Sequence, residues 1–359
     1  MLPGGLFGTK YASDLAIIRT KTQWFLLAVL LVVFIIIVPM MSTDYWLTQF
    51  THIAITIIVV LGLHILAGLC GLISIGQAGF VCVGAFTTAI LVSHWDFNGW
   101  LCLPIAALAG GLAGLFFGLP SFRLKMFYLA ISTLAAYWII IWAFKYRDIS
   151  DVTGGFTGLD LSAHPLTLGG IDFSEDVNLY ILAVILVVIG TFIAKNIQRS
   201  NTGRKFVAIR DNELAAEVSG VNLFKNKLLA FFIGCAFAGV AGWLWAYSQQ
   251  RVTPSDFTLM DGIWYMGMIV IGGWGSTVGV FLGAFMLDFL GIMISDNLAP
   301  WIVDFVPDRW GAQMYVVLKL VLGGLGMVMF MKFVPNGLAG VWQKAKLSYR
   351  LYPYSSTES

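Results

Sequence analysis

Long apolar runs separated by short polar segments dominate the chain and predict a bundle of membrane-spanning helices. A spanning helix needs about 20 mostly apolar residues, with a lower limit of about 17. One apolar stretch, 262–295, is too long for a single helix, and the glycines of 272–279 interrupt it, so we divide it into two short antiparallel spans. The predicted spans are 24–41, 52–73, 79–94, 100–118, 126–144, 178–194, 227–247, two within 262–295, and 313–332.

The distribution of charge supports about ten spans with both ends of the chain in the cytoplasm. Cytoplasmic loops of membrane proteins are enriched in Lys and Arg. With the N-terminus inside, most of the 21 Lys and Arg residues fall in cytoplasmic segments, and most acidic residues fall outside. The predicted organisation is an N-terminal cytoplasmic segment 1–23, a transmembrane domain 24–334 and a cytoplasmic tail 335–359. The transmembrane domain contains an external loop, 145–177, and a basic cytoplasmic loop, 195–227.

Composition excludes several classes of protein. The chain is 59% hydrophobic and 11% charged, whereas soluble domains carry about a quarter charged residues. Its four cysteines and four histidines are scattered, so we expect no metal site. The sequence has no G-x-x-x-x-G-K-[ST] motif, and no catalytic set of residues stands out. We therefore expect a non-catalytic membrane protein that binds no cofactor and no nucleic acid.

The basic loop contains a segment, 211–220, that is typical of a short docking helix. Asp211 suits the N-cap, Glu213 favours the positive helix start, and Gly220 supplies a stop. Leu214, Val218 and Val221 form an apolar stripe. A helix of about nine residues is marginal alone in water, so it must lie in a groove of a soluble partner or on the protein's own cytoplasmic face. The candidate coupling residues are Arg210, Asp211, Glu213, Leu214, Ala215, Ala216, Glu217, Val218 and Gly220.

Two further segments combine glycine with polar residues. The break 71–79 holds Ser74, Gly76 and Gln77, and unwound backbone in a membrane is tolerated where protein or a water-filled path covers it. These three residues are candidates for lining a substrate path, and a plain turn is the alternative. The predicted external loop, 145–177, is either a docking platform for an external partner or a solvated connector. Its candidate residues are Thr153, Gly154, Gly155, Thr157 and Gly158.

Asp288 and Lys319 fall at similar depths in successive spans. An unpaired charge inside a membrane is costly, so we expect a structural ion pair, with separate snorkelling of the two side chains as the alternative.

The segment 203–222, followed by 227–231, closely resembles the cytoplasmic signature of branched-chain amino acid ABC importer permeases, on the side of the second, LivM-like subunit. The segments 71–80, 272–279 and 335–340 also match, and the resemblance extends from about residue 50 to 342. In the external loop, Phe156 and Thr157 stand where the family commonly has Pro-Asp. Importers of urea and short amides share this permease type and are an alternative.

The resemblance implies an ABC importer permease fold in a bacterial cytoplasmic membrane, importing branched-chain or other neutral amino acids by alternating access. It implies a second, homologous permease subunit, two ABC ATPase subunits that bind ATP and Mg²⁺, and an external substrate-binding protein. The segment 211–220 would then be seated on an ATPase subunit. An ion-coupled secondary transporter is the remaining alternative, and it would call for acidic residues at mid-membrane and internal repeats.

Overall fold

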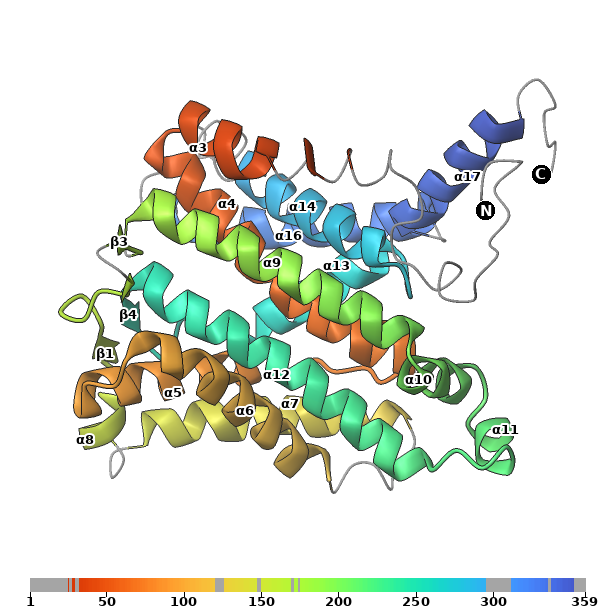
Figure 1. Cartoon of the computed structure of the whole chain (residues 1–359), viewed down its shortest axis with the longest axis horizontal. Coiled ribbons are helices and arrows are strands. Elements are labelled where there is room, and N and C mark those ends of the chain that lie inside the picture. Colours follow the sequence, from red (N-terminus) through yellow and green to blue (C-terminus); the bar gives the residue numbers. More distant parts are fainter. Residues whose placement is uncertain are drawn as a thin grey trace.

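The computed structural model describes residues 32–119, 126–146, 150–168, 171–173, 175–294, 311–334 and 337–351, together with the isolated positions 25, 28 and 29. Long helices run side by side through most of this region (Figure 1). In chain order the main helices are α4 (Asp44–Leu63), α5 (Gln77–Trp95), α6 (Gly99–Gly118), α7 (Met126–Lys145), α9 (Asp176–Arg199), α10 (Asn201–Asp211), α11 (Glu213–Val218), α12 (Leu223–Gln249), α13 (Leu259–Gly272), α14 (Thr277–Met293), α16 (Gly311–Phe333) and α17 (Gly337–Leu351).

Over the part of the chain that it describes, the structure is mostly helical, with four short strands, and supports the prediction of a multi-pass membrane protein built from helices. Within the described ranges, six helical stretches are long and apolar enough to cross a membrane, namely Asp44–Leu69, Gln77–Trp95, Gly99–Gly118, Tyr128–Lys145, Asp176–Arg199 and Leu223–Gln249. Shorter apolar helices cover Leu259–Gly272, Thr277–Met293 and Leu320–Phe330. The division of 262–295 into two helices joined by a glycine-rich turn is also correct. The total of ten spans and the cytoplasmic location of both termini stay predictions.

The first two predicted spans have different boundaries in the structure. Of 24–41 the structure describes mainly residues 32–41, as a π-helical turn (Val33–Ile37) followed by α3 (Val38–Met41). Helix α4 begins earlier than the predicted residue 52. Its polar first turns fit a helix because the hydroxyls of Thr48 and Thr51 donate hydrogen bonds to the carbonyls of Asp44 and Leu47.

Helix α12 passes through the middle of the bundle and packs against α6, α5 and α4 (Figure 1). Glycines allow this close approach, since a Cβ added at Gly239 would lie 2.2 Å from the carbonyl oxygen of Ala106. One added at Gly234 would lie 2.5 Å from the side chain of Leu66. The indole of Trp243, fully buried, donates a hydrogen bond to the carbonyl of Gly99 at 2.9 Å.

The chain between α4 and α5 is unwound inside the bundle. Helix α4 continues as a π-helix (His64–Leu69), ends at Gly71 with a φ of +77°, and is followed by the non-helical segment 71–76. Gly71 lies against Arg210, next to α11, whereas Gln77 donates a hydrogen bond to the carbonyl of Gly234, well inside α12. The segment 71–76 therefore runs back from the end of the bundle toward its middle, and α5 begins there.

Short strands close the end of the bundle opposite α10 and α11 (Figure 1). Strand β1 (Leu159–Asp160) pairs antiparallel with β4 (Arg251–Val252), with Leu159 opposite Val252. Strand β2 (Thr167–Leu168) pairs with β3 (Ile171–Asp172), and α8 (Ser150–Thr153) precedes them. This pairing holds the loop predicted to be external against the segment that follows α12.

Candidate coupling site

The basic segment is more helical than its sequence suggested. Helix α10, which the sequence analysis did not predict, starts at Ser200, whose hydroxyl oxygen accepts a hydrogen bond from the backbone N–H of Gly203. Phe206 and Ile209, three residues apart on one face, are buried in the core. Their spacing was the available sequence signal. These contacts fix the orientation of α10 and therefore the position at which α11 begins.

Helix α11 is shorter than predicted and has a different cap. It spans Glu213–Val218, and Asn212 rather than Asp211 is its N-cap, with its side-chain oxygen accepting from the N–H of Ala215 at 3.1 Å. Asp211 is the last residue of α10, and its carboxylate binds the guanidinium of Arg210. The predicted stop is correct, since Gly220 has a φ of +82° and the N–H of the residue after it, Val221, reaches back to the carbonyl of Ala216.

The two faces of α11 differ. Ala216 is buried against the rest of the chain, while Leu214 is 74% exposed and Val218 is 90% exposed. Val221, the third member of the predicted stripe, packs partly against the core. One face of the helix thus lies on the protein itself, and the other presents two apolar side chains one turn apart. Ala215, Glu217 and Gly220 are also exposed.

An ion pair ties the start of α11 to the start of α12. The Nζ atom of Lys227 lies 2.7 Å from Oε1 of Glu213. Lys227 is buried and Glu213 is half-buried. The Glu213 carboxylate therefore compensates the positive charge of the buried lysine. Removing one partner of a buried pair leaves an uncompensated charge, which is strongly destabilising.

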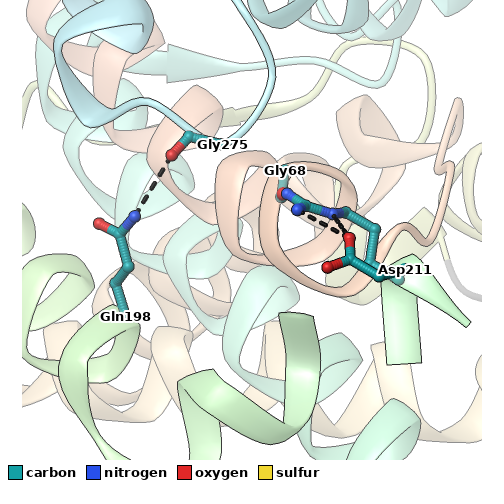
Figure 2. Close-up of polar contacts among 5 residues, drawn as sticks. Gly68, Gln198, Asp211 and Gly275 are labelled. Atoms are coloured by element: carbon teal, nitrogen blue, oxygen red, sulfur yellow. Dashed lines mark hydrogen bonds and ion pairs between the residues drawn. The ribbon is translucent and has the colours of Figure 1, made fainter. Parts of the chain in front are cut away.

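Arg210 connects the same segment to the π-helix that ends α4. Its Nη1 donates a hydrogen bond to the carbonyl of Gly68 at 2.8 Å, while Nε and Nη2 donate to Asp211 Oδ1 at 3.0 and 2.9 Å (Figure 2). The last carbonyls of a helix have no partner within it and carry its negative dipole end. A guanidinium held in place by Asp211 satisfies one of them.

The turn between α13 and α14 meets the other side of Arg210. Gln198 donates from Nε2 to the carbonyl of Gly275 at 3.3 Å (Figure 2). Gly275 has a φ of +78°, and a Cβ there would lie 3.2 Å from Nη1 of Arg210. The two glycine-rich breaks, 71–76 and 273–276, therefore both lie against Arg210, the first at the base of its side chain and the second at its guanidinium. Sequence reasoning treated these motifs separately and missed Gly68, Gln198 and Lys227, since no local pattern connects residues so far apart.

The predicted path residues lie in the packed interior. Ser74 and Gln77 are fully buried, and Gly76 packs directly against the backbone of Thr133. Thr133 also accepts a hydrogen bond from the N–H of Ile75 at 3.2 Å. Among the described residues, the Ser74 hydroxyl and Oε1 of Gln77 have no hydrogen-bond partner. A path along this break stays a prediction.

The predicted external docking residues mainly shape the loop. The buried Thr153 donates from its hydroxyl to the carbonyl of Phe144, and Thr157 donates to the carbonyl of Gly154. Gly154, Gly155 and Gly158 all have positive φ. The residue that this turn presents is Phe156, 75% exposed, with Lys145 Nζ 5.8 Å from the centre of its ring. The sequence analysis did not select Phe156 as a contact residue.

The predicted ion pair between Asp288 and Lys319 falls partly outside the described residues. Asp288 lies on α14, but the side chain of Lys319 is outside the described residues. The pair stays a prediction.

A membrane bundle with the sequence segment 203–222 and these glycine breaks has the features of a transport permease. The chain belongs to the family described as branched-chain amino acid transport system / permease component, whose profile matches residues 42–322. The resemblance stated from the sequence is thereby confirmed.

Individual relatives agree with the family and show its range. The high-affinity branched-chain amino acid transport system permease protein LivM of Salmonella typhimurium is 33% identical over 341 residues, covering 89% of this chain and 75% of the relative. LivM of Escherichia coli is 34% identical over the same shares. The guanosine ABC transporter permease protein NupP of Bacillus subtilis is 29% identical over 62% of this chain and 66% of its own length. No solved structure matches the chain significantly.

Proposed function

We propose that this chain is a permease subunit of an ATP-driven importer of branched-chain or similar neutral amino acids, and that α11 docks on a separate ATPase subunit. The observation that carries the proposal is the pair of exposed apolar side chains, Leu214 and Val218, on a helix braced against its own bundle. Two such side chains one turn apart suit the groove of a partner protein.

The bracing supplies a physical basis for coupling. A displacement of α11 by a closing ATPase pair would reach the π-helix through Arg210 and α12 through Glu213. The segments 71–76 and 273–276 adjoin Arg210, and glycines with positive φ mark helix ends there. Breaks of this kind are where helices can change direction. Motion delivered at α11 is thus applied next to the points at which the spans bend.

The end of segment 71–76 that lies inside the bundle, next to Gln77, supports a substrate path beside it. Helix α5 begins inside the bundle at Gln77, and no side chain caps its first turn. The unpaired hydroxyl of Ser74 and the free amide oxygen of Gln77 are polar groups that a passing solute or water could bind. On the opposite face, Phe156 is the residue best placed to contact a substrate-binding protein, in an assembly with a second permease subunit in a bacterial cytoplasmic membrane.

Uptake by the reconstituted assembly tests the proposal. The chain would be purified with the permease, ATPase and binding-protein subunits encoded beside it and placed in proteoliposomes. We expect uptake of labelled leucine to require ATP, to be competed by isoleucine and valine, and to be insensitive to ionophores. Competition by urea or guanosine instead would assign another substrate, and uptake driven by an ion gradient without ATP would refute the ATP-driven importer.

The same preparation tests the docking face. Val218→Asp places a charge on the exposed apolar side of α11 and should weaken ATPase co-purification about tenfold or more, with normal membrane insertion. Glu217→Gln is the matched control, because Glu217 is exposed on the same helix but is not part of the apolar pair. Unchanged co-purification of the Val218→Asp variant would eliminate α11 as the docking element.

A further inference from the structure

The C-terminal helix α17 carries an apolar stripe that continues beyond the edge of the bundle. Leu338, Val341 and Trp342 share one helix face because they stand at positions i, i+3 and i+4. Leu338 packs against the core, whereas Val341 is 49% exposed and Trp342 is 59% exposed. The first turn of α17 contacts α13 and α14, and the rest extends away from them (Figure 1). The stripe therefore meets whatever surrounds the protein at this point.

The neighbouring helix, α16, indicates that lipid surrounds the protein near this stripe. The last turns of α16 expose Val328, Met329 and Phe333, as expected of a helix whose side faces lipid. The chain then turns sharply at Gly337, which has a φ of +69° and would place a Cβ 2.4 Å from Cα of Gly273. This close packing fixes the start of α17 against the end of α13, and the N–H of Gly337 also donates to the carbonyl of Val334, just after α16. The helix begins at the rim of an apolar surface, where the headgroup region of a bilayer lies.

The charge of the segment points to one leaflet and one class of lipid. Residues 332–351 include Lys332, Lys344, Lys346 and Arg350 and contain no Asp or Glu. Helices that lie in a membrane interface combine an apolar stripe with basic residues, and tryptophan prefers the headgroup level. Anionic lipids of the cytoplasmic leaflet attract such segments by roughly fivefold in affinity per basic residue.

A pocket lies between α17 and the turn 273–276. Its volume is about 270 Å³. Its polar lining, Ser276, Gln343 and Lys344, offers a hydroxyl, an amide and an ammonium group, all of which can donate to a phosphate. Trp274 forms part of the wall. The pocket adjoins the turn 273–276, whose Gly275 accepts a hydrogen bond from Gln198 and lies against the guanidinium of Arg210.

We propose that α17 is an interfacial helix that binds anionic phospholipid, with Val341 and Trp342 at the acyl boundary and the headgroup phosphate in this pocket. The inference rests on the proposed orientation, with α10 and α11 in the cytoplasm. Since the turn 273–276 also contacts Gln198 and Arg210, a lipid held there packs against the base of the coupling site.

A single fluorescent label tests the proposal, because the native cysteines Cys70, Cys82, Cys102 and Cys235 are all buried and should label poorly. Trp342→Cys carries an environment-sensitive fluorophore, and the full chain is placed in phosphatidylcholine vesicles with brominated acyl chains, with or without phosphatidylglycerol. We expect strong bromine quenching with phosphatidylglycerol and weak quenching without it. Val218→Cys is the matched control, because this exposed position on α11 should be quenched in neither.

Charge reversal and competition sharpen the result. The double variant Lys344→Glu/Lys346→Glu should require at least about fivefold more phosphatidylglycerol for half-maximal quenching. Inorganic phosphate at matched ionic strength should leave quenching unchanged. Equal quenching in both vesicles, displacement by free phosphate, or protection of the label that depends on added ATPase subunits would each overturn the assignment to anionic lipid. No arm needs ATP or substrate, so failure here is separable from failure of the importer proposal.

Discussion

The two ends of the bundle each present an exposed apolar side chain, but they hold it in different ways. At one end, α11 exposes Leu214 and Val218 and is joined by charged side chains to distant parts of the fold, through Arg210 to Gly68 and through Glu213 to Lys227. At the other end, Phe156 stands on a turn held mainly by backbone hydrogen bonds and glycine packing, with a longer link from Nε of Arg251 to the carbonyl of Thr157 at 3.2 Å.

The two kinds of attachment suit two different tasks: passing a displacement into the bundle, and exposing a side chain to a partner. A helix connected to several spans by directed, charge-assisted bonds passes on a displacement, because such bonds resist both stretching and reorientation. The turn at 153–158 is held by glycine packing and by the pairing of β1 with β4, contacts that position Phe156 for recognition. We therefore expect changes at α11 to affect coupling and changes at the external turn to affect only recognition.

The largest effect is expected from Glu213→Ala. It leaves Lys227 buried without its carboxylate, and because the Glu213 side of the pair is partly exposed we expect the free energy of unfolding to fall by about 2 kcal/mol. Thermal unfolding of the purified chain in detergent measures this. Glu217→Ala, on the exposed side of the same helix, is the control and should change stability little. A second change, Lys227→Met, should restore much of the loss; if the double variant is no more stable than Glu213→Ala alone, the pair does not brace α11.

Sequence reasoning went further with single elements than with the junctions between them. The apolar runs, the division of 262–295 and the stop at Gly220 could be predicted because each depends on local composition or on one backbone conformation. The cap of α11 was misassigned because both Asp211 and Asn212 suit that position. In the structure the Asp211 carboxylate accepts from the neighbouring Arg210, and the Asn212 amide oxygen accepts from the N–H of Ala215.

The contacts between separate elements could not be predicted from any pattern in the sequence. The residues Gly68, Gln198, Arg210 and Gly275 come together from four elements. No helical or strand period links positions so far apart. The same holds for the external turn, where the glycines were conspicuous in sequence but Phe156, an ordinary apolar residue, is what the fold exposes.

An intermediate effect is expected from Arg210→Lys, which tests transmission directly. Lysine keeps the positive charge but cannot donate to Gly68 and Asp211 from one rigid planar group. A hydrogen bond to a charged group contributes about 1.5–3 kcal/mol, so we expect transport at saturating ATP to fall about tenfold while ATPase co-purification stays normal. Arg204→Lys is the matched control, since Arg204 is exposed and makes only a local contact with the carbonyl of Arg199. A parallel loss of ATPase binding and transport would mean that Arg210 maintains the docking face rather than transmitting motion from it.

The smallest effect is expected from Phe156→Ala at the opposite end. The ring is mostly solvent-exposed and makes a cation–π contact with Lys145 that is worth about 0.5–1 kcal/mol at an exposed site, so the fold should lose little. If Phe156 contacts a binding protein, the concentration of that protein needed for half-maximal uptake should rise about fivefold, as for an interface residue that contributes about 1 kcal/mol. Maximal uptake and ATPase co-purification should stay at the level of the unaltered chain. Phe97→Ala, on a residue that is also exposed at this end, is the matched control. A fall in maximal uptake with an unchanged half-maximal concentration would place Phe156 in transmission, and the two ends of the bundle would then work alike.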